Sequence, residues 1–219
     1  MIYITGDTHG INDFEKLIHH EFKKEDYLII CGDCGIVWNQ DKLPIYIKFY
    51  EELNCTVLFV DGNHENFSLL NKFPIKNYLG GKVHVISDNI YHLMRGEVFT
   101  IEGFTFLAFG GADSIDKHLR KENISWWEEE RPTLNDIDNA LKNLEKHKNN
   151  VDYIITHTCD EKTLYNKYFR SINAKIYPSN TYLNFLEQIN YKKWFFGHYH
   201  LDQEIDEKKR CLYHDIISI

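Results

Sequence analysis

Short apolar runs alternate with polar segments along the first 60 residues of the chain. Three of these runs have the length and aliphatic content of buried strands: 2–5, 27–31 and 56–60. A helix is expected after Asn12, which can cap it, with an apolar face made by Phe14, Leu17, Ile18 and Phe22. A second helical stretch covers 42–53. This β-α-β-α-β order predicts a mostly parallel sheet with crossover helices.

The rest of the chain has shorter strand-like runs and one clear helix. Glu102 and Gly103 predict a hairpin between two of the runs. The strands are expected at 83–86, 90–93, 98–101, 104–109, 153–156, 193–196 and 211–217. Pro132 and Thr133 are expected to open a helix whose apolar stripe is Leu134, Ile137, Leu141 and Leu144. The pattern predicts one layered α/β domain over 1–219.

Composition and charge narrow the class of protein. With 43% hydrophobic and 15% aromatic residues the chain can bury a substantial core. A formal charge of -8 argues against stable binding of duplex nucleic acid. No stretch has the length of a membrane span or the pattern of a signal peptide. The odd number of cysteines, five, indicates reduced thiols and a cytoplasmic location. Cys31 and Cys34 form one isolated Cys-x-x-Cys, which we interpret as coincidental.

Five polar motifs, most of them containing glycine, each come directly after an apolar run. They are Asp7-Thr8-His9-Gly10, Gly32-Asp33, Gly62-Asn63-His64-Glu65, Thr156-His157 and Gly197-His198-Tyr199-His200. In parallel sheets, ligands gather at the carboxyl ends of the strands. Mixed carboxylate, imidazole and amide ligands suit divalent transition metals better than Mg²⁺ or Ca²⁺. Any one of these histidines could instead be an ordinary surface or core residue, but the five motifs together predict a two-metal hydrolytic site.

In this order, the motifs resemble the calcineurin-like metallophosphoesterase superfamily, and most closely its bacterial and bacteriophage-type phosphatases. The resemblance implies a central β-sandwich flanked by helices, with a dinuclear metal centre at the strand ends. It implies a first metal held by Asp7, His9, Asp33 and His200. It implies a second metal held by Asp33, Asn63, His157 and His198, with Asp33 bridging the pair. Mn²⁺ is the expected metal, and Fe, Zn²⁺, Co²⁺ and Ni²⁺ also suit such a site.

The resemblance also implies a mechanism of phosphoester hydrolysis. Two metals lower the pKa of a bridging water, and the resulting hydroxide attacks phosphorus in line. His64 protonates the leaving alkoxide as a general acid, so His64 and Asp33 are the expected catalytic residues. The substrate-binding candidates are Asn63, His64, Arg95 and Arg120.

One departure from the superfamily's protein phosphatases affects the predicted substrate. Their Gly-Asp motif continues to an Asp-Arg pair that orients the catalytic histidine and grips phosphate, whereas Ile36 and Val37 occupy these positions here. Arg95 and Arg120 are the preferred replacements as phosphate ligands. For each arginine taken alone, a surface or structural role is the more common alternative.

The sequence does not decide the role of two segments. Trp126 and Trp127, before an acidic run, could cap the site and stack a nucleobase, or could pack into the core. The tyrosine-rich segment 163–178 could be a lid or a subunit contact.

The favoured function is metal-dependent hydrolysis of a small phosphorylated substrate, with a nucleotide or cyclic nucleotide as the leading example. The alternatives are a Ser/Thr-type protein phosphatase or a nuclease of the same superfamily. A binding scaffold without catalysis is disfavoured because every expected ligand position and His64 are filled.

Overall fold

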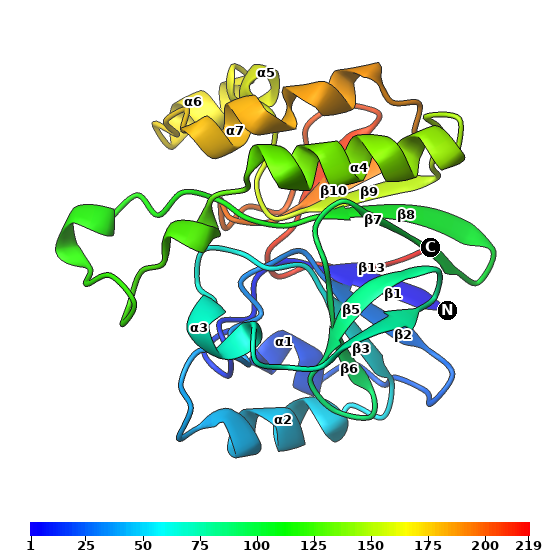
Figure 1. The fold of residues 1–219 in the computed structure, drawn as a ribbon, viewed down its shortest axis with the longest axis vertical. Helices are drawn as coiled ribbons and strands as arrows, with labels where there is room; N and C mark the ends of the chain where they lie inside the picture. The colour runs from blue at the N-terminus through cyan, green and yellow to red at the C-terminus, as the bar shows by residue number, and fades with distance from the viewer.

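The computed structural model describes all residues, 1–219, and contains two β-sheets packed face to face between two layers of helices (Figure 1). The larger sheet has the strand order β13 (Ile216–Ser218), β1 (Ile2–Thr5), β2 (Tyr27–Ile30), β3 (Thr56–Phe59), β6 (Ile90–Leu93), β5 (Gly81–Val85) and β4 (Ile75–Tyr78). Strands β1, β2, β3 and β6 are parallel, as the β-α-β-α-β order predicts.

The smaller sheet has the order β11 (Gln203–Glu204), β12 (Lys209–Cys211), β10 (Lys193–Phe196), β9 (Tyr153–Thr156), β8 (Phe104–Phe109) and β7 (Glu97–Ile101). Its four central strands are parallel, while β7 and β8 form the hairpin predicted at Glu102 and Gly103. Both of these turn residues have positive φ.

Helices cover the outer face of each sheet (Figure 1). The larger sheet is covered by α1 (Glu15–Ile18), α2 (Leu43–Glu51) and α3 (Phe67–Leu70). The smaller sheet is covered by α4 (Leu134–Lys146), α5 (Glu161–Leu164), α6 (Lys167–Ser171) and α7 (Pro178–Tyr182), followed by a 3₁₀ turn at Leu183–Gln188. No helix is both long enough and apolar enough to cross a membrane.

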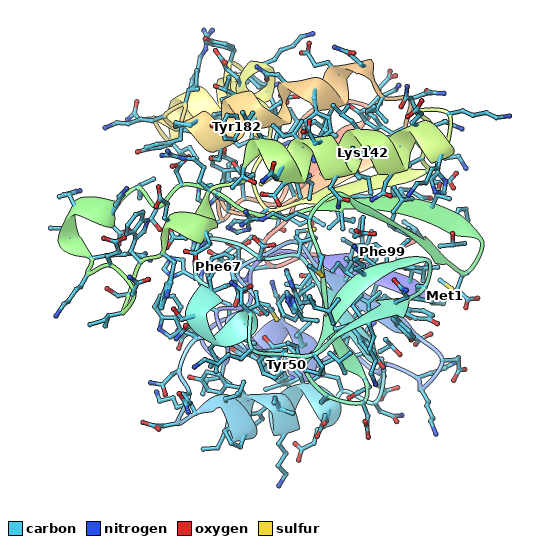
Figure 2. The ribbon with its side chains drawn as sticks, viewed as in Figure 1. Met1, Tyr50, Phe67, Phe99, Lys142 and Tyr182 are labelled. Carbon is cyan, nitrogen blue, oxygen red and sulfur yellow. The ribbon has the colours of Figure 1, made fainter.

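The alternation of side chains along the strands builds three apolar layers. On β2, Leu28 and Ile30 pack against the outer helices, whereas Ile29 faces the other sheet. Figure 2 shows Phe99 in the layer between the sheets and Tyr50 on the side of α2. The two sheets are therefore fixed against each other by a continuous core, which holds their strand ends in register.

The predicted fold class, a β-sandwich flanked by helices, is confirmed, but several element predictions were wrong in detail. The first helix is a single turn, so only Leu17 is buried on it and Ile18 is exposed. On α4, Leu134 and Leu141 are exposed. The helix instead packs Ala140 against Gly96, and the Asn143 side chain donates a hydrogen bond to the Gly96 carbonyl.

The end of the chain was also predicted incorrectly. Residues 211–217 do not form one strand, because the chain crosses from β12 in one sheet to β13 in the other. At the crossing, the Asp202 carboxylate accepts the backbone N–H groups of Tyr213, His214 and Asp215. Strands β4 and β11, for which no apolar run gave a signal, were not predicted.

Candidate metal centre

The five polar motifs meet at one end of the sandwich. Asp7, Asp33 and Asn63 lie in the loops after β1, β2 and β3, and His157 and His198 lie in the loops after β9 and β10. Because these strands are parallel within each sheet, their carboxyl ends lie at the same edge. The loops of both sheets therefore bring their side chains to one place.

The backbone of these loops is in an uncommon conformation at four non-glycine positions of the site. The φ angles are 45° at His9, 46° at Asp33, 69° at His198 and 50° at His200. Left-handed φ is unfavourable for residues with a Cβ and persists only where the surroundings impose it. The gathering of four such residues at one site indicates that the loops are shaped for the placement of these side chains.

Asp33 lies at the middle of the gathered side chains. Its Oδ2 is 3.3 Å from His9 Nε2 and its Oδ1 is 3.3 Å from His157 Nε2, so its two oxygens face different imidazoles. Asp7 Oδ2 is 3.2 Å from His200 Nε2. Two groups, Asp7-His9-His200 and Asp7-Asp33-His157, each have donor atoms within 4.8 Å of one another.

The remaining two predicted ligands lie beside this cluster. Asn63 Oδ1 is 3.2 Å from His157 Nε2. The His198 ring lies with its centroid 4.9 Å from that of His157, and it lines the same cavity. The structure thus brings together all seven residues that the sequence predicts as metal ligands.

Each of three imidazoles has a second partner that fixes its orientation. His9 Nδ1 lies 2.6 Å from Asp13 Oδ2, and His157 Nδ1 donates to the Cys31 carbonyl at 2.8 Å. The His200 ring stacks on Tyr213 with a centroid separation of 4.3 Å. With Nδ1 of His9 and His157 engaged outward, their Nε2 atoms are free to bind a cation, as in typical histidine metal sites.

Two glycines of the motifs are required by close packing. A Cβ on Gly62 would lie 2.1 Å from Asp33 Oδ1, and a Cβ on Gly197 would lie 2.2 Å from Asp7 Oδ1. Any side chain at either position would displace a carboxylate of the cluster. The close approach of the Asp33 and Asp7 carboxylates therefore requires glycine at both positions.

The electrostatics of the cluster favour positive charge. Burial disfavours a charged His157, but the carboxylates of Asp33 and Asp7 outweigh burial and raise its pKa to about 10. At His9, burial again disfavours the charged form, but the nearby carboxylates, chiefly that of Asp33, outweigh burial and raise the pKa to about 9. His198 has its pKa lowered to about 4, mainly by burial and next by the charge of His157, which together outweigh the carboxylates of Asp33 and Asp7.

The donor set fits divalent cations. Asp7 Oδ2 is buried without a hydrogen bond of acceptable geometry, although His200 Nε2 lies 3.2 Å away. A buried carboxylate oxygen without a partner is costly unless a cation neutralises it. Carboxylate oxygens, imidazole nitrogens and an amide oxygen that converge in this way suit metals such as Mn²⁺, Fe or Zn²⁺.

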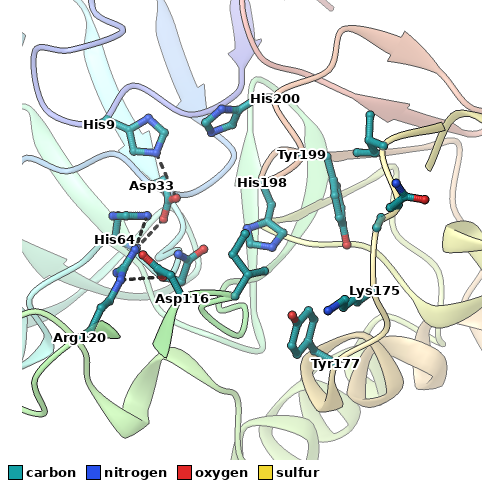
Figure 3. Close-up of a pocket in the computed structure, with 15 residues that line it drawn as sticks. His9, Asp33, His64, Asp116, Arg120, Lys175, Tyr177, His198, Tyr199 and His200 are labelled. Atoms are coloured by element: carbon teal, nitrogen blue, oxygen red, sulfur yellow. Dashed lines mark hydrogen bonds and ion pairs between the residues drawn. The ribbon is translucent and has the colours of Figure 1, made fainter. Parts of the chain in front are cut away.

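His64 and Arg120 stand together beside the cluster (Figure 3). Arg120 Nη2 donates to His64 Nε2 at 3.0 Å, and Arg120 Nε pairs with Asp116 at 2.7 Å. The His64 ring also packs on Trp38. Burial lowers the pKa of His64, Asp33 opposes this effect, and Arg120 adds to it. The hydrogen bond from Arg120 thus holds the His64 ring through Nε2.

Arg95, the other predicted phosphate ligand, lies elsewhere. It forms an ion pair with the buried Asp61 and donates to the carbonyls of Glu129 and Glu130. It lines a different cavity, which contains neither His64 nor Asp33. This prediction is not supported, because Arg95 is used to neutralise Asp61 rather than to face the metal cluster.

The cluster opens into a cavity of about 650 Å³. His64 and Arg120 form one wall, and Lys175 and Tyr177 lie across from them (Figure 3). Part of the tyrosine-rich segment 163–178 therefore lines the site. Trp127 is buried and donates to Ser68 Oγ at 2.8 Å, which supports packing over nucleobase stacking for this residue.

Several residues of the site were not singled out from the sequence. Asp13 has the clearest signal, since it follows His9 by four residues and could reach the same ring. Ser114, Asp116 and Tyr213 have no such signal, because only the tertiary fold brings them near. Cys31 and Cys34 are both buried, and burial raises the pKa of each thiol, which fits packing rather than redox chemistry.

Comparison with known protein families agrees with this geometry. The family model for calcineurin-like phosphoesterases matches residues 1–202. The chain therefore belongs to the calcineurin-like phosphoesterase family, and metal-dependent phosphoester hydrolysis is the general activity of that family. Comparisons with curated proteins and with solved structures gave no match.

Proposed function

We propose that this protein hydrolyses a small phosphorylated substrate at a dinuclear metal centre. One observation carries the proposal: the seven predicted ligands converge beside a cavity that five of them line and whose wall holds His64 and Arg120. One metal would be held by Asp7, His9, Asp33 and His200. The other would be held by Asp33, Asn63, His157 and His198.

The protein's own residues have distinct tasks in this proposal. Two bound cations, Mn²⁺ being the expected pair, would supply Lewis acidity toward the phosphoryl group and a water of lowered pKa. Arg120 offers guanidinium donors to a phosphoryl oxygen. A phosphoryl group that takes over those donors would free His64 Nε2, which now accepts from Arg120, to take up a proton from water. His64 could then give that proton to the leaving oxygen.

The cavity supports a substrate larger than inorganic phosphate. Its volume of about 650 Å³ lies within the range of small-molecule sites. Tyr177, Tyr199 and Ile172 offer apolar and aromatic surface beyond the metal cluster, and Lys175 offers a positive charge. A nucleotide or cyclic nucleotide fits this mixture, because it combines a planar base with a phosphate.

A matched pair of nitrophenyl esters tests the proposal. Turnover of the phosphomonoester and the phosphodiester would be measured with Mn²⁺ and again after chelation. Hydrolysis of at least one ester that disappears with the chelator is expected. Equal turnover with and without chelator, or none on either ester and on a panel of nucleotides with metal bound, would contradict it.

A further inference from the structure

Residues 110–131, between β8 and α4, place two buried polar side chains behind the metal cluster. Ser114 is 6% exposed and Glu130 is 1% exposed. The Ser114 hydroxyl lies 2.5 Å from Glu130 Oε2, and Asn63 Nδ2 lies 3.3 Å from Ser114 Oγ. These contacts form a series of hydrogen bonds from Glu130 through Ser114 to Asn63.

The chemistry of the three groups determines which of them donates in each of these hydrogen bonds. Glu130 Oε1 accepts the backbone N–H of Trp127, so both carboxylate oxygens act as acceptors. The Ser114 hydroxyl donates its only proton to Glu130 Oε2. Burial raises the pKa of Glu130 to about 7, and the ionised carboxylate, present above that pH, can only accept. The lone pair of Ser114 then accepts from Asn63, which must present its NH₂ group to Ser114.

This direction decides which end of the Asn63 amide faces the metal cluster. The two ends of a carboxamide have nearly the same shape, so packing alone selects weakly between them. Only the oxygen can bind a cation, because the nitrogen presents two N–H donors. With Nδ2 held by Ser114, Oδ1 faces the other way and lies 3.2 Å from His157 Nε2.

We propose that Ser114 and Glu130 are positioning residues that orient Asn63 as a metal ligand. The inference rests on the proposed function in one respect, that Asn63 binds a metal. It also gives a role to the acidic run 128–130, in which Glu128 and Glu129 are exposed and only Glu130 is buried. A buried carboxylate is costly unless hydrogen bonds compensate it. The hydrogen bonds from Ser114 and Trp127 offset part of this cost, and burial still raises the pKa of Glu130 to about 7.

Binding of Mn²⁺ to the chelator-treated, full-length protein tests the proposal without any substrate. In titration calorimetry, Ser114→Ala is expected to weaken one of the two binding steps by about 10- to 100-fold, the usual effect of losing a partner of a metal ligand. The other step should keep its wild-type affinity, because Asn63 belongs to one ligand set only. A merely structural role would not separate the two steps.

Matched variants sharpen the test. Ser114→Thr keeps a hydroxyl and should restore most of the lost affinity. Glu130→Gln keeps the shape but can donate as well as accept, so it should weaken the same step. Glu129→Gln changes an exposed neighbour whose side chain makes no hydrogen bond, and it should bind Mn²⁺ like the wild type.

The possible outcomes separate this inference from the proposed function. Wild-type affinity at both steps in Ser114→Ala and Glu130→Gln would overturn the positioning role. If Ser114→Ala does not fold, as judged by thermal unfolding without metal, Glu130→Gln and Ser114→Thr decide the question. A wild-type protein that binds Mn²⁺ but hydrolyses no phosphoester would overturn the proposed function alone.

Discussion

The loops that follow the parallel strands and the segment 110–131 both contribute to the site, but they hold their side chains in different ways. In the strand-end loops, ligands such as Asp33 and His157 lie within a few residues of a buried strand. In the segment 110–131, Ser114 and Arg120 lie in irregular chain with one short 3₁₀ turn between them, Lys117–Leu119. They are held by contacts with residues far away in the sequence, Asn63 and His64.

We expect this difference in anchoring to divide the tasks of the two regions, with metal binding in the strand-end loops and its adjustment in the segment 110–131. The strand-end loops are anchored by the sheets, so they can hold unfavourable backbone angles and closely packed glycines. The segment 110–131 supplies Ser114 and Arg120, which contact Asn63 and His64, and Arg120 lines the cavity of the site. Changes in the first region should abolish metal binding, and changes in the second should tune it.

The largest effect is expected for Asp33→Asn. Asp33 faces both His9 and His157, so weakening this one residue should disturb both metal sites. Turnover should fall below detection and metal analysis should show less than one ion per chain. Normal metal content in a folded Asp33→Asn protein would contradict the bridging role.

The next largest effect is expected for His64→Ala. Both metals should remain, because His64 belongs to neither ligand set, while turnover of an ester with a poor leaving group should fall by about 10²- to 10⁴-fold. A nitrophenyl ester, whose leaving group needs little protonation, serves as the control and should lose less. Equal losses on both esters would argue against a general acid.

A large effect on stability, rather than on catalysis, is expected for Arg95→Met. This change leaves the buried Asp61 without its ion-pair partner, which typically costs about 3–5 kcal/mol of unfolding free energy. Burial raises the pKa of Asp61, but Arg95 and His92 outweigh burial and keep it below its usual value. The stability gained from this pair is therefore present above about pH 4 and is lost as the pH falls below it. Urea unfolding at pH 7 and pH 3 measures both effects, and a variant as stable as the wild type at pH 7 would contradict the structural role.

A smaller effect, on catalysis alone, is expected for Arg120→Met. The loss of a charged hydrogen bond to phosphate, worth about 1.5–3 kcal/mol, should lower kcat/KM by roughly 10- to 150-fold. Unfolding free energy should change little, since Arg120 pairs mainly with the half-exposed Asp116. Loss of Arg95 should therefore lower stability, whereas loss of Arg120 should lower kcat/KM. An Arg120→Met enzyme with wild-type kcat/KM would contradict a role of Arg120 in binding phosphate.

The convergence of the seven candidate ligands could be predicted from the sequence because each follows a recognisable strand and the strands are parallel. The lining of the cavity could be predicted only in part: His64 and Arg120 were candidates, whereas Lys175 and Tyr177 were not, because their positions depend on where irregular segments turn. Arg95 and Arg120 look alike in the sequence, yet one neutralises Asp61 and the other contacts His64. Similarly, only half of the apolar stripe predicted on α4 faces the core. Ile137 and Leu144 pack there, but Leu134 and Leu141 are exposed because Gly96 selects Ala140 for the contact. Local pattern fixes the periodicity of an element, while its packing partner selects the buried face.

Titration of the chelator-treated wild-type protein with Mn²⁺, with bound metal and nitrophenyl ester turnover measured in the same samples, tests the central claim most directly. Turnover should be absent without metal and should rise to a plateau at two ions per chain. Turnover that is unaffected by metal, or full activity with no ion bound, would contradict the assignment of Asp7, Asp33 and the converging histidines as a catalytic metal centre.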